Sequence, residues 1–229
     1  MAGPYFTPAL FSFLIDLGEN NDRAWFDAHR ERYERDLKEP ALRFIRDFGE
    51  PLRGISPHFE AVPKAVGGSL FRIFRDTRFS ADKRPYKTNT GLHFRHVSAK
   101  DAHAPGFYLH LAPGEVFGGF GLWEPDPPTL ARLRDAIVAQ PDRWAAIKAE
   151  LDLSGMPCAM ADGMLKRVPP GYPKDHPHAE DLKRKSHAAS VRFTEADATA
   201  PDFLERYAAA CRRAAPVMAF LCEAVGVPF

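Results

Sequence analysis

The stretch GFYLHLAPGEVFGGFGLW, residues 106–123, decides the fold class. It consists of two runs in which apolar side chains alternate with other residues, and the turn-forming pair Pro113 and Gly114 lies between them. In the first run Tyr108 and His110 alternate with Phe and Leu, so one face is expected to meet the core and the other to meet solvent or a cleft. Two strands joined by so short a turn pair with each other in an antiparallel manner.

The residues before this hairpin predict more strands, and helices before those. SLFRIF at 69–74 and TGLHFRHV at 90–97 are short runs that contain aromatic and apolar residues and are bounded by Gly and Pro. Residues 7–54 carry apolar side chains three and four positions apart, which is helical spacing. Helical spacing returns after the hairpin, and the last helix is expected to bend at Pro216. The helices expected there cover residues 127–139, residues 142–151 and a long terminal segment.

The order of these elements is helices, then strands, then helices. This order indicates an α+β fold with a mostly antiparallel sheet flanked by N-terminal and C-terminal helices. We expect a single domain over residues 1–229, because no linker, repeat or low-complexity tract interrupts the pattern. With 229 residues, of which 45% are hydrophobic, the chain can bury a sizeable core.

Composition and charge exclude several classes of protein. The formal net charge is +1, so any affinity for nucleic acid or a membrane has to come from a local patch. No apolar run reaches the roughly 20 residues of a membrane-spanning helix, and the N-terminus lacks the basic segment of a secretory signal. We therefore expect a cytoplasmic protein without a membrane partner. The three cysteines lack CxxC spacing and fit neither a disulfide framework nor a zinc ribbon.

Three glycines, Gly118, Gly119 and Gly121, interrupt the second strand of the hairpin. Glycine weakens a strand unless the backbone has to come close to a ligand or to another element. The spacing matches neither a phosphate-binding loop nor a dinucleotide fingerprint, so a structural use is favoured and no cofactor is expected.

Positive charge is concentrated in residues 71–96. The only carboxylates within this segment are Asp76 and Asp82. They face the cations Arg75, Arg78, Lys83, Arg84, Lys87 and Arg95. Either acids elsewhere in the chain or an external anion must neutralise the surplus. Arginine presents planar pairs of donors that suit phosphate and carboxylate, so the segment predicts an anion site.

Two other interpretations of the segment stay open. Ser80 and Asp82 are typical loop and cap residues and Pro85 fixes a turn, so an Arg–Asp network could simply hold the loop in place. Alternatively, basic residues interleaved with aromatic ones are typical of a surface that stacks nucleic-acid bases. The aromatic residues concerned are Phe71, Phe74, Phe79, Tyr86 and Phe94.

Candidates for proton transfer can be named, but no spacing links them. His93, His110 and His176 titrate near neutral pH, and Tyr86 or Ser80 could supply a hydroxyl group. Neither the pair His93 and His96 nor the pair His176 and His178 is completed by a carboxylate or Cys at ligand spacing, so no metal site is predicted. Whether the protein catalyses a reaction stays open at this point.

The run RIFRDTRFSADKRPYKTN, residues 72–89, resembles the signature R-I-Y/F-R-D-x-R-F-S-x-D-K-x-P-Y-K of a family known as domain of unknown function twenty-four sixty-one. The run ENNDRAWFDAHRERYE, residues 19–34, is similar to the N-terminal helix of that family, and residues 106–123 are similar to its Gly-rich hairpin. The resemblance covers nearly the whole chain and implies one domain, but no particular activity. It also implies a second basic motif that acts together with the first. This motif, LKRVPPGY with DHP and LKRKS, holds Lys166, Arg167, His176 and Lys185.

We therefore expect the two basic segments to converge at one edge of the sheet and to form a pocket for a small ligand that bears a phosphate or a carboxylate. Asp76 and Asp82 are expected to orient the cations, and Tyr86 and His176 to transfer protons if the ligand reacts. The anion-binding candidates are Arg75, Arg78, Lys83 and Lys87, joined by Ser80, Lys166, Arg167 and Lys185 through the resemblance. Nucleic acid is the alternative partner.

Overall fold

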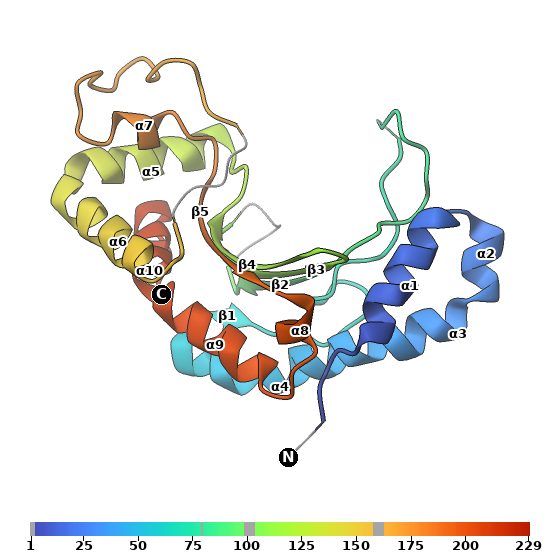
Figure 1. Cartoon of the computed structure of the whole chain (residues 1–229). Helices are drawn as coiled ribbons and strands as arrows, with labels where there is room; N and C mark the ends of the chain where they lie inside the picture. Colours follow the sequence, from blue (N-terminus) through green and yellow to red (C-terminus); the bar gives the residue numbers. More distant parts are fainter. Residues whose placement is uncertain (1–2, 79, 99–103, 158–162) are drawn as a thin grey trace.

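The computed structural model describes residues 3–78, 80–98, 104–157 and 163–229. Its centre is a five-stranded sheet in which each strand pairs antiparallel with the next one along the chain (Figure 1). The strands are β1 (Phe59–Glu60), β2 (Thr90–His96), β3 (Gly106–Ala112), β4 (Glu115–Leu122) and β5 (His187–Phe193). The predicted α+β class is confirmed. The expected hairpin is β3–β4, and its turn residue Gly114 has a φ of 73°, in the left-handed region that glycine tolerates.

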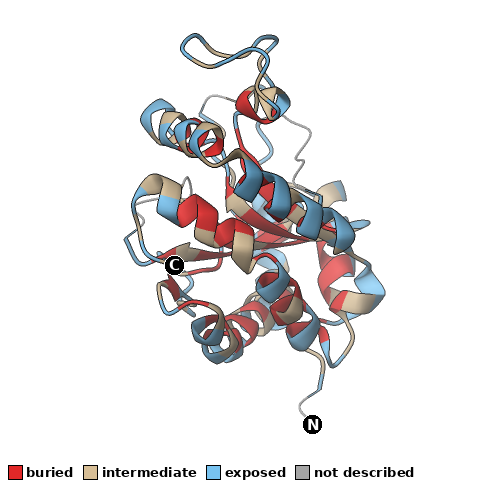
Figure 2. Cartoon of the chain, turned by 90° about the vertical axis from the view of Figure 1, so that its left-hand side faces the viewer, coloured by how far each residue is buried: buried red, intermediate tan, exposed pale blue. Residues whose placement is uncertain are grey.

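Helices cover one face of the sheet. Phe48 of α4 (Glu39–Ile55) has its ring centroid 4.7 Å from that of Phe94 in β2 and 5.1 Å from that of Tyr207 in α9 (Phe203–Arg213). Buried residues, red in Figure 2, follow the strands and the inward sides of these helices. The remaining helices are α1 (Pro8–Glu19), α2 (Arg23–Ala28), α3 (Arg30–Tyr33), the π-helical turn η1 (Glu34–Lys38), α5 (Pro127–Ala139), α6 (Pro141–Leu153), α7 (Ala179–Leu182), α8 (Glu195–Ala198) and α10 (Ala215–Val225).

The opposite face of β2, β3 and β4 has no helix lying across it within the described residues (Figure 1). Residues directly opposite each other on neighbouring strands point to the same face. The pairing places His93, Tyr108, Gly119 and Ser190 in one row across β2 to β5. Because Phe94 and its neighbours fill the helix-covered side, this row lies on the open side. The alternation in β3 therefore places Tyr108 away from the core.

The strand expected at residues 69–74 is not formed. Only isolated bridges occur there, between Leu70 and Leu92 and between Phe74 and Tyr86. The Phe71 N–H still donates to the Gly91 carbonyl of β2. Beyond Phe71 the chain leaves the sheet and bonds to itself, because the Arg75 N–H donates to the Pro85 carbonyl and the Lys87 N–H to the Ile73 carbonyl. The sequence also gives no signal for β5, because HAASVRF contains small residues and only one β-branched residue.

The last helical segment is two helices rather than one bent helix. α9 ends at Arg213, and α10 begins at Ala215 with Pro216 in its first turn. Proline has no backbone N–H and therefore fits the first turn of a helix, where that donor has no intrahelical partner.

Asn21 connects the basic loop, residues 71–89 before β2, to the N-terminal helices. Its side-chain amide donates to the Tyr86 carbonyl at 3.1 Å and accepts from the Tyr86 N–H at 3.0 Å. The Tyr86 ring stacks on Phe26 of α2 with ring centroids 4.2 Å apart. Asp22 accepts from the Trp25 N–H and caps α2, which fixes the backbone next to Asn21. One amide thus holds two segments that are far apart in the sequence.

Within the described residues, no helix is both long and apolar enough to span a bilayer. Cys211 and Cys222 are buried and unpaired. Cys158 and Phe79 lie outside the described residues.

We predict that Asn21→Ala lowers the free energy of unfolding by about 1–3 kcal/mol, because both backbone groups of Tyr86 lose their partner in a partly buried place. Chemical denaturation measures this change. The matched control is Asn20→Ala, because the Asn20 side chain makes only an exposed bond to the Asp16 carbonyl. Equal losses in the two variants would contradict the role assigned to Asn21.

Candidate ligand-binding site

Two adjoining hollows lie on the open face of the sheet. The first, which we call the aromatic hollow, has a volume of about 320 Å³. Among its lining residues are Phe71, His93, Tyr108, Phe117, Gly119 and Trp123. The second, the polar basin, has a volume of about 560 Å³. Among its lining residues are Arg75, Asp82, Arg84, Lys87, His110 and Glu115. His110 lines both hollows, so they meet at its ring.

Glycines in the strands make room for the rings of this site. A Cβ atom added at Gly91 would lie 2.5 Å from the Tyr108 hydroxyl oxygen, and one added at Gly106 would lie 2.2 Å from Nε2 of His93. Both rings therefore lie directly over a glycine of the neighbouring strand. At Gly119 an added Cβ atom would have its nearest neighbours at 3.8 Å, so a methyl group would fit above this residue without displacing them.

Tyr108, His110 and Glu115 form a chain of polar groups. The Tyr108 hydroxyl lies 3.0 Å from Nδ1 of His110, and Nε2 of His110 lies 3.8 Å from a carboxylate oxygen of Glu115. The His110 ring stacks on Phe117, with ring centroids 4.7 Å apart. Burial raises the pKa of Tyr108 to about 12, with a smaller contribution from Glu115. Tyr108 is thus a proton donor at neutral pH.

Burial also keeps the histidines of the site neutral. It lowers the pKa of His110, although the charge of Glu115 opposes this shift. It lowers the pKa of His93 to about 4, with a smaller contribution from the positive charge of Arg95. A neutral His110 can accept a hydrogen bond from the Tyr108 hydroxyl at Nδ1, and the two pKa shifts keep the proton on Tyr108.

The arginines at the basin are paired with aspartates of their own segment. Asp82 accepts from both Arg75 and Arg84, and Asp76 accepts from Arg78 at 2.6 Å. Hydrogen bonds from Arg84 and then Arg75 lower the pKa of Asp82, and hydrogen bonds from Arg78 lower that of Asp76. For these guanidinium groups, the structure agrees with the interpretation that an Arg–Asp network holds the loop in place.

Lys87 differs from these arginines. Its ammonium group lies 5.4 Å from the ring centroid of Phe71, above the ring. The side chain is half-buried, and burial lowers its pKa, with a further contribution from the positive charge of Arg72. Within the described residues, no carboxylate lies within ion-pair distance of Lys87. Lys87 is therefore a partly desolvated cation between the aromatic hollow and the polar basin.

Residues 9–220 match the model of a family described as conserved hypothetical protein (DUF2461). The chain belongs to this family. The match confirms the resemblance found in the sequence. Comparisons with curated proteins and with solved structures gave no match.

The structure of this DUF2461 member separates the two basic segments. Glu115, which lines the polar basin, starts β4, whereas Leu122 at its other end pairs with His187. Lys185 lies just before His187. The eight residues of β4 span about 25 Å at roughly 3.3 Å per residue, which is longer than any side chain. The expected convergence at one edge is thus wrong, because the antiparallel order places the segments at opposite ends of the strands.

The residues of the second segment have local contacts. Lys166 and Arg167 are exposed in the loop before α7, on the left of Figure 1, whereas the loop with Lys87 rises on the right. His176 accepts the backbone N–H of His178 at Nδ1. A common site of these residues with Lys87 is therefore not formed.

The remaining candidates from the first segment have various surroundings. Tyr86 is buried against Phe26 and lines the polar basin. Lys83 donates to the Thr77 carbonyl at 2.9 Å, and Ser80 is half-buried in the same loop. Ion pairing with Arg78 occupies Asp76.

Sequence reasoning did not assign Tyr108, Phe117, Gly119 or Glu115 to a site. The signal for Tyr108 was its place on the non-core face of β3, and the signal for Gly119 was a glycine within a strand. Glu115 gave no signal, because its approach to His110 depends on the pairing of β3 with β4.

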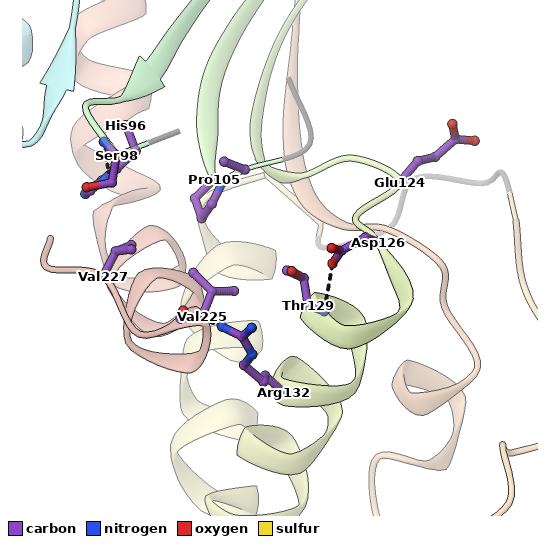
Figure 3. A pocket seen from close by; sticks show the side chains of 10 residues that line it. His96, Ser98, Pro105, Glu124, Asp126, Thr129, Arg132, Val225 and Val227 are labelled. Atoms are coloured by element: carbon purple, nitrogen blue, oxygen red, sulfur yellow. Dashed lines mark hydrogen bonds between the residues drawn. The ribbon is translucent and has the colours of Figure 1, made fainter. Parts of the chain in front are cut away.

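A third hollow, of about 420 Å³, lies near the C-terminal helix (Figure 3). Asp126 accepts the N–H of Thr129 and caps α5, and Arg132 donates to the Val225 carbonyl at 3.1 Å. These polar groups serve the ends of helices, so this hollow is a weaker candidate. Within the described residues, no group of three or more His, Cys, Asp or Glu side chains could hold a metal ion.

We predict that Gly106→Ala lowers the free energy of unfolding by about 1–3 kcal/mol, because the new methyl group must displace the buried His93 ring. Gly119→Ala is the matched control in the next strand, and it should change stability by less than about 1 kcal/mol because its methyl group fits. Thermal unfolding of both variants measures the difference. A larger loss of stability for Gly119→Ala would show that a methyl group does not fit above Gly119.

We predict that stability falls as the pH is lowered from 6.5 to 4. In this range the unfolded chain protonates His93 and His187, whereas the folded protein, in which burial lowers both pKa values to about 4, does not. The free energy of unfolding should drop by up to about 1.4 kcal/mol per pH unit for each of these protons. Denaturation at a series of pH values gives the free energy of unfolding as a function of pH, and its slope should be shallower for His93→Gln than for the wild type. An unchanged slope would show that His93 is not buried as neutral imidazole.

Proposed function

We propose that the polar basin recognises a small ligand bearing a phosphate or a carboxylate. The observation that carries this proposal is Lys87, a half-buried ammonium group without a carboxylate partner in the described part of the chain. Removing a cation from water is unfavourable unless a counter-charge compensates for the lost hydration. A bound anion would provide that counter-charge.

The neighbouring guanidinium groups support the proposal. Asp82 is shared by Arg75 and Arg84, so one negative charge serves two positive ones. Each guanidinium group has five N–H donors, and the bonds to Asp82 occupy only some of them. Arg75 and Arg84 both line the basin next to Lys87. An oxyanion placed there would meet one ammonium group and two partly compensated guanidinium groups.

The alternative of a nucleic-acid surface has less support. It requires exposed aromatic rings along the basic segment. Phe71 and Phe74 are exposed, but Tyr86 and Phe94 are buried among other rings.

We predict that Lys87→Met abolishes binding of inorganic phosphate and leaves the protein as stable or up to about 1 kcal/mol more stable, because it removes a desolvated charge. Burial lowers the pKa of Lys87 in the folded protein, so the unfolded chain holds the ammonium proton more tightly than the folded protein does. At neutral pH the positive charge of Lys87 therefore opposes folding. Phosphate at 100 times its dissociation constant should add about 2.7 kcal/mol of stability to the wild type and none to the variant. Thermal unfolding with and without phosphate measures both effects.

The matched control is Lys166→Met, which removes an exposed lysine at the opposite end of the sheet. It should leave the phosphate effect intact. A destabilised Lys87→Met that still responds to phosphate would assign Lys87 to the scaffold and contradict the proposal. A response to oligonucleotides alone, declining steeply with salt, would favour the nucleic-acid surface instead.

A further inference from the structure

We propose that the anionic group bound in the polar basin is attached to a planar aromatic ring, and that this ring occupies the aromatic hollow above Gly119. The ligand class is then an aryl or heteroaryl phosphate or carboxylate. This inference rests on the proposed function and adds to it the chemistry of the rest of the ligand.

The floor of the hollow is bare backbone. Gly119 has an ordinary φ, and a Cβ atom added there would touch nothing closer than the rings of Phe117 and Tyr108 at 3.8 Å. Neither the backbone conformation nor the packing of the described residues therefore requires glycine at this position. Ala188 extends the floor on β5 with only a methyl group. A flat ring can approach such a surface more closely than it can approach a strand with side chains.

The walls of the hollow are rings. Phe71 and Phe117 lie on either side of Tyr108, with ring centroids 6.0 Å and 5.9 Å from the Tyr108 ring. Trp123 at the rim is 40% exposed and Phe71 is 36% exposed, so both rings present apolar surface that a ligand could cover. Aromatic walls favour an aromatic guest because edge-to-face and offset contacts add to the burial of apolar surface. The volume of about 320 Å³ is at the lower end for ligand sites and suits a small ring system.

The two hollows are close enough for one small ligand. Both are lined by His110, and Lys87 of the basin lies above the ring of Phe71 in the hollow. A group bonded directly to a ring on the floor therefore reaches the ammonium group without a long linker. The positive charge of Lys87 thus lies beside a hollow lined mainly by rings, which complements a ring that is charged at one end only.

The experiment compares the binding of phenyl phosphate, cyclohexyl phosphate and inorganic phosphate by isothermal titration calorimetry. Burial of a phenyl ring is expected to tighten binding by about tenfold to a hundredfold over inorganic phosphate. Phenyl phosphate should also bind more tightly than cyclohexyl phosphate, whose ring is not flat. Gly119→Val should fill the floor and reduce the affinity for phenyl phosphate to that for inorganic phosphate, without changing the latter.

Ser190→Val is the matched control, because Ser190 faces Gly119 in the same row but does not line the hollow. It should leave all three affinities unchanged. If Gly119→Val does not fold, Gly119→Ala replaces it, because its methyl group fits the space.

The possible outcomes separate this inference from the proposed function. If phenyl phosphate and inorganic phosphate bind equally tightly and neither binds to Lys87→Met, the proposal of a bound ring is overturned and the anion site is retained. Equal affinities for phenyl and cyclohexyl phosphate, or insensitivity of phenyl phosphate to Gly119→Val, would likewise overturn it. If no probe binds, or if the Lys87→Met variant binds the probes as tightly as the wild type, both the anion site and the ring site are overturned.

Discussion

The whole molecule depends on a sheet that, over the residues the structure describes, is covered by helices on one face only. Side chains alternate between the two faces of a strand, so a strand that fills the core on one side must present a different set on the other. In β2 and β3 the core side receives residues such as Phe94 and Leu109, and the open side receives His93 and Tyr108. The same antiparallel register that builds the core therefore also places the residues that the strands contribute to the candidate site.

The charged loop is a second level of organisation. Arg75, Arg78 and Arg84 are bound to aspartates two to seven positions away, so these three guanidinium groups are held by carboxylates of the loop itself. The loop is fastened at Tyr86 by the Asn21 amide, and Lys87 is the next residue. The position of the Lys87 ammonium group thus depends on a contact with the N-terminal helices rather than on its charged neighbours.

Local patterns in the sequence predict this fold well, and they predict the site in part. Alternation placed Tyr108 on the non-core face, and the surplus of charge drew attention to Lys87. The assignment of His176 to the same site failed, because its distance from Lys87 depends on which end of β4 each segment adjoins. The predicted strand at residues 69–74 failed for a similar reason, because alternation describes side chains but does not reveal whether a partner strand is present. Long-range register is the information that one sequence does not display.

The position of Trp123 has a consequence for spectroscopy. The protein has three tryptophans: Trp144 is fully buried, Trp25 is half-buried and stacked on His29, and Trp123 stands at the rim of the aromatic hollow. Indole emission shifts to longer wavelengths in water, and among these residues Trp123 has the largest contact with solvent. The red edge of the intrinsic fluorescence therefore reports chiefly on the surroundings of the hollow, and the protein can be observed there without an attached dye.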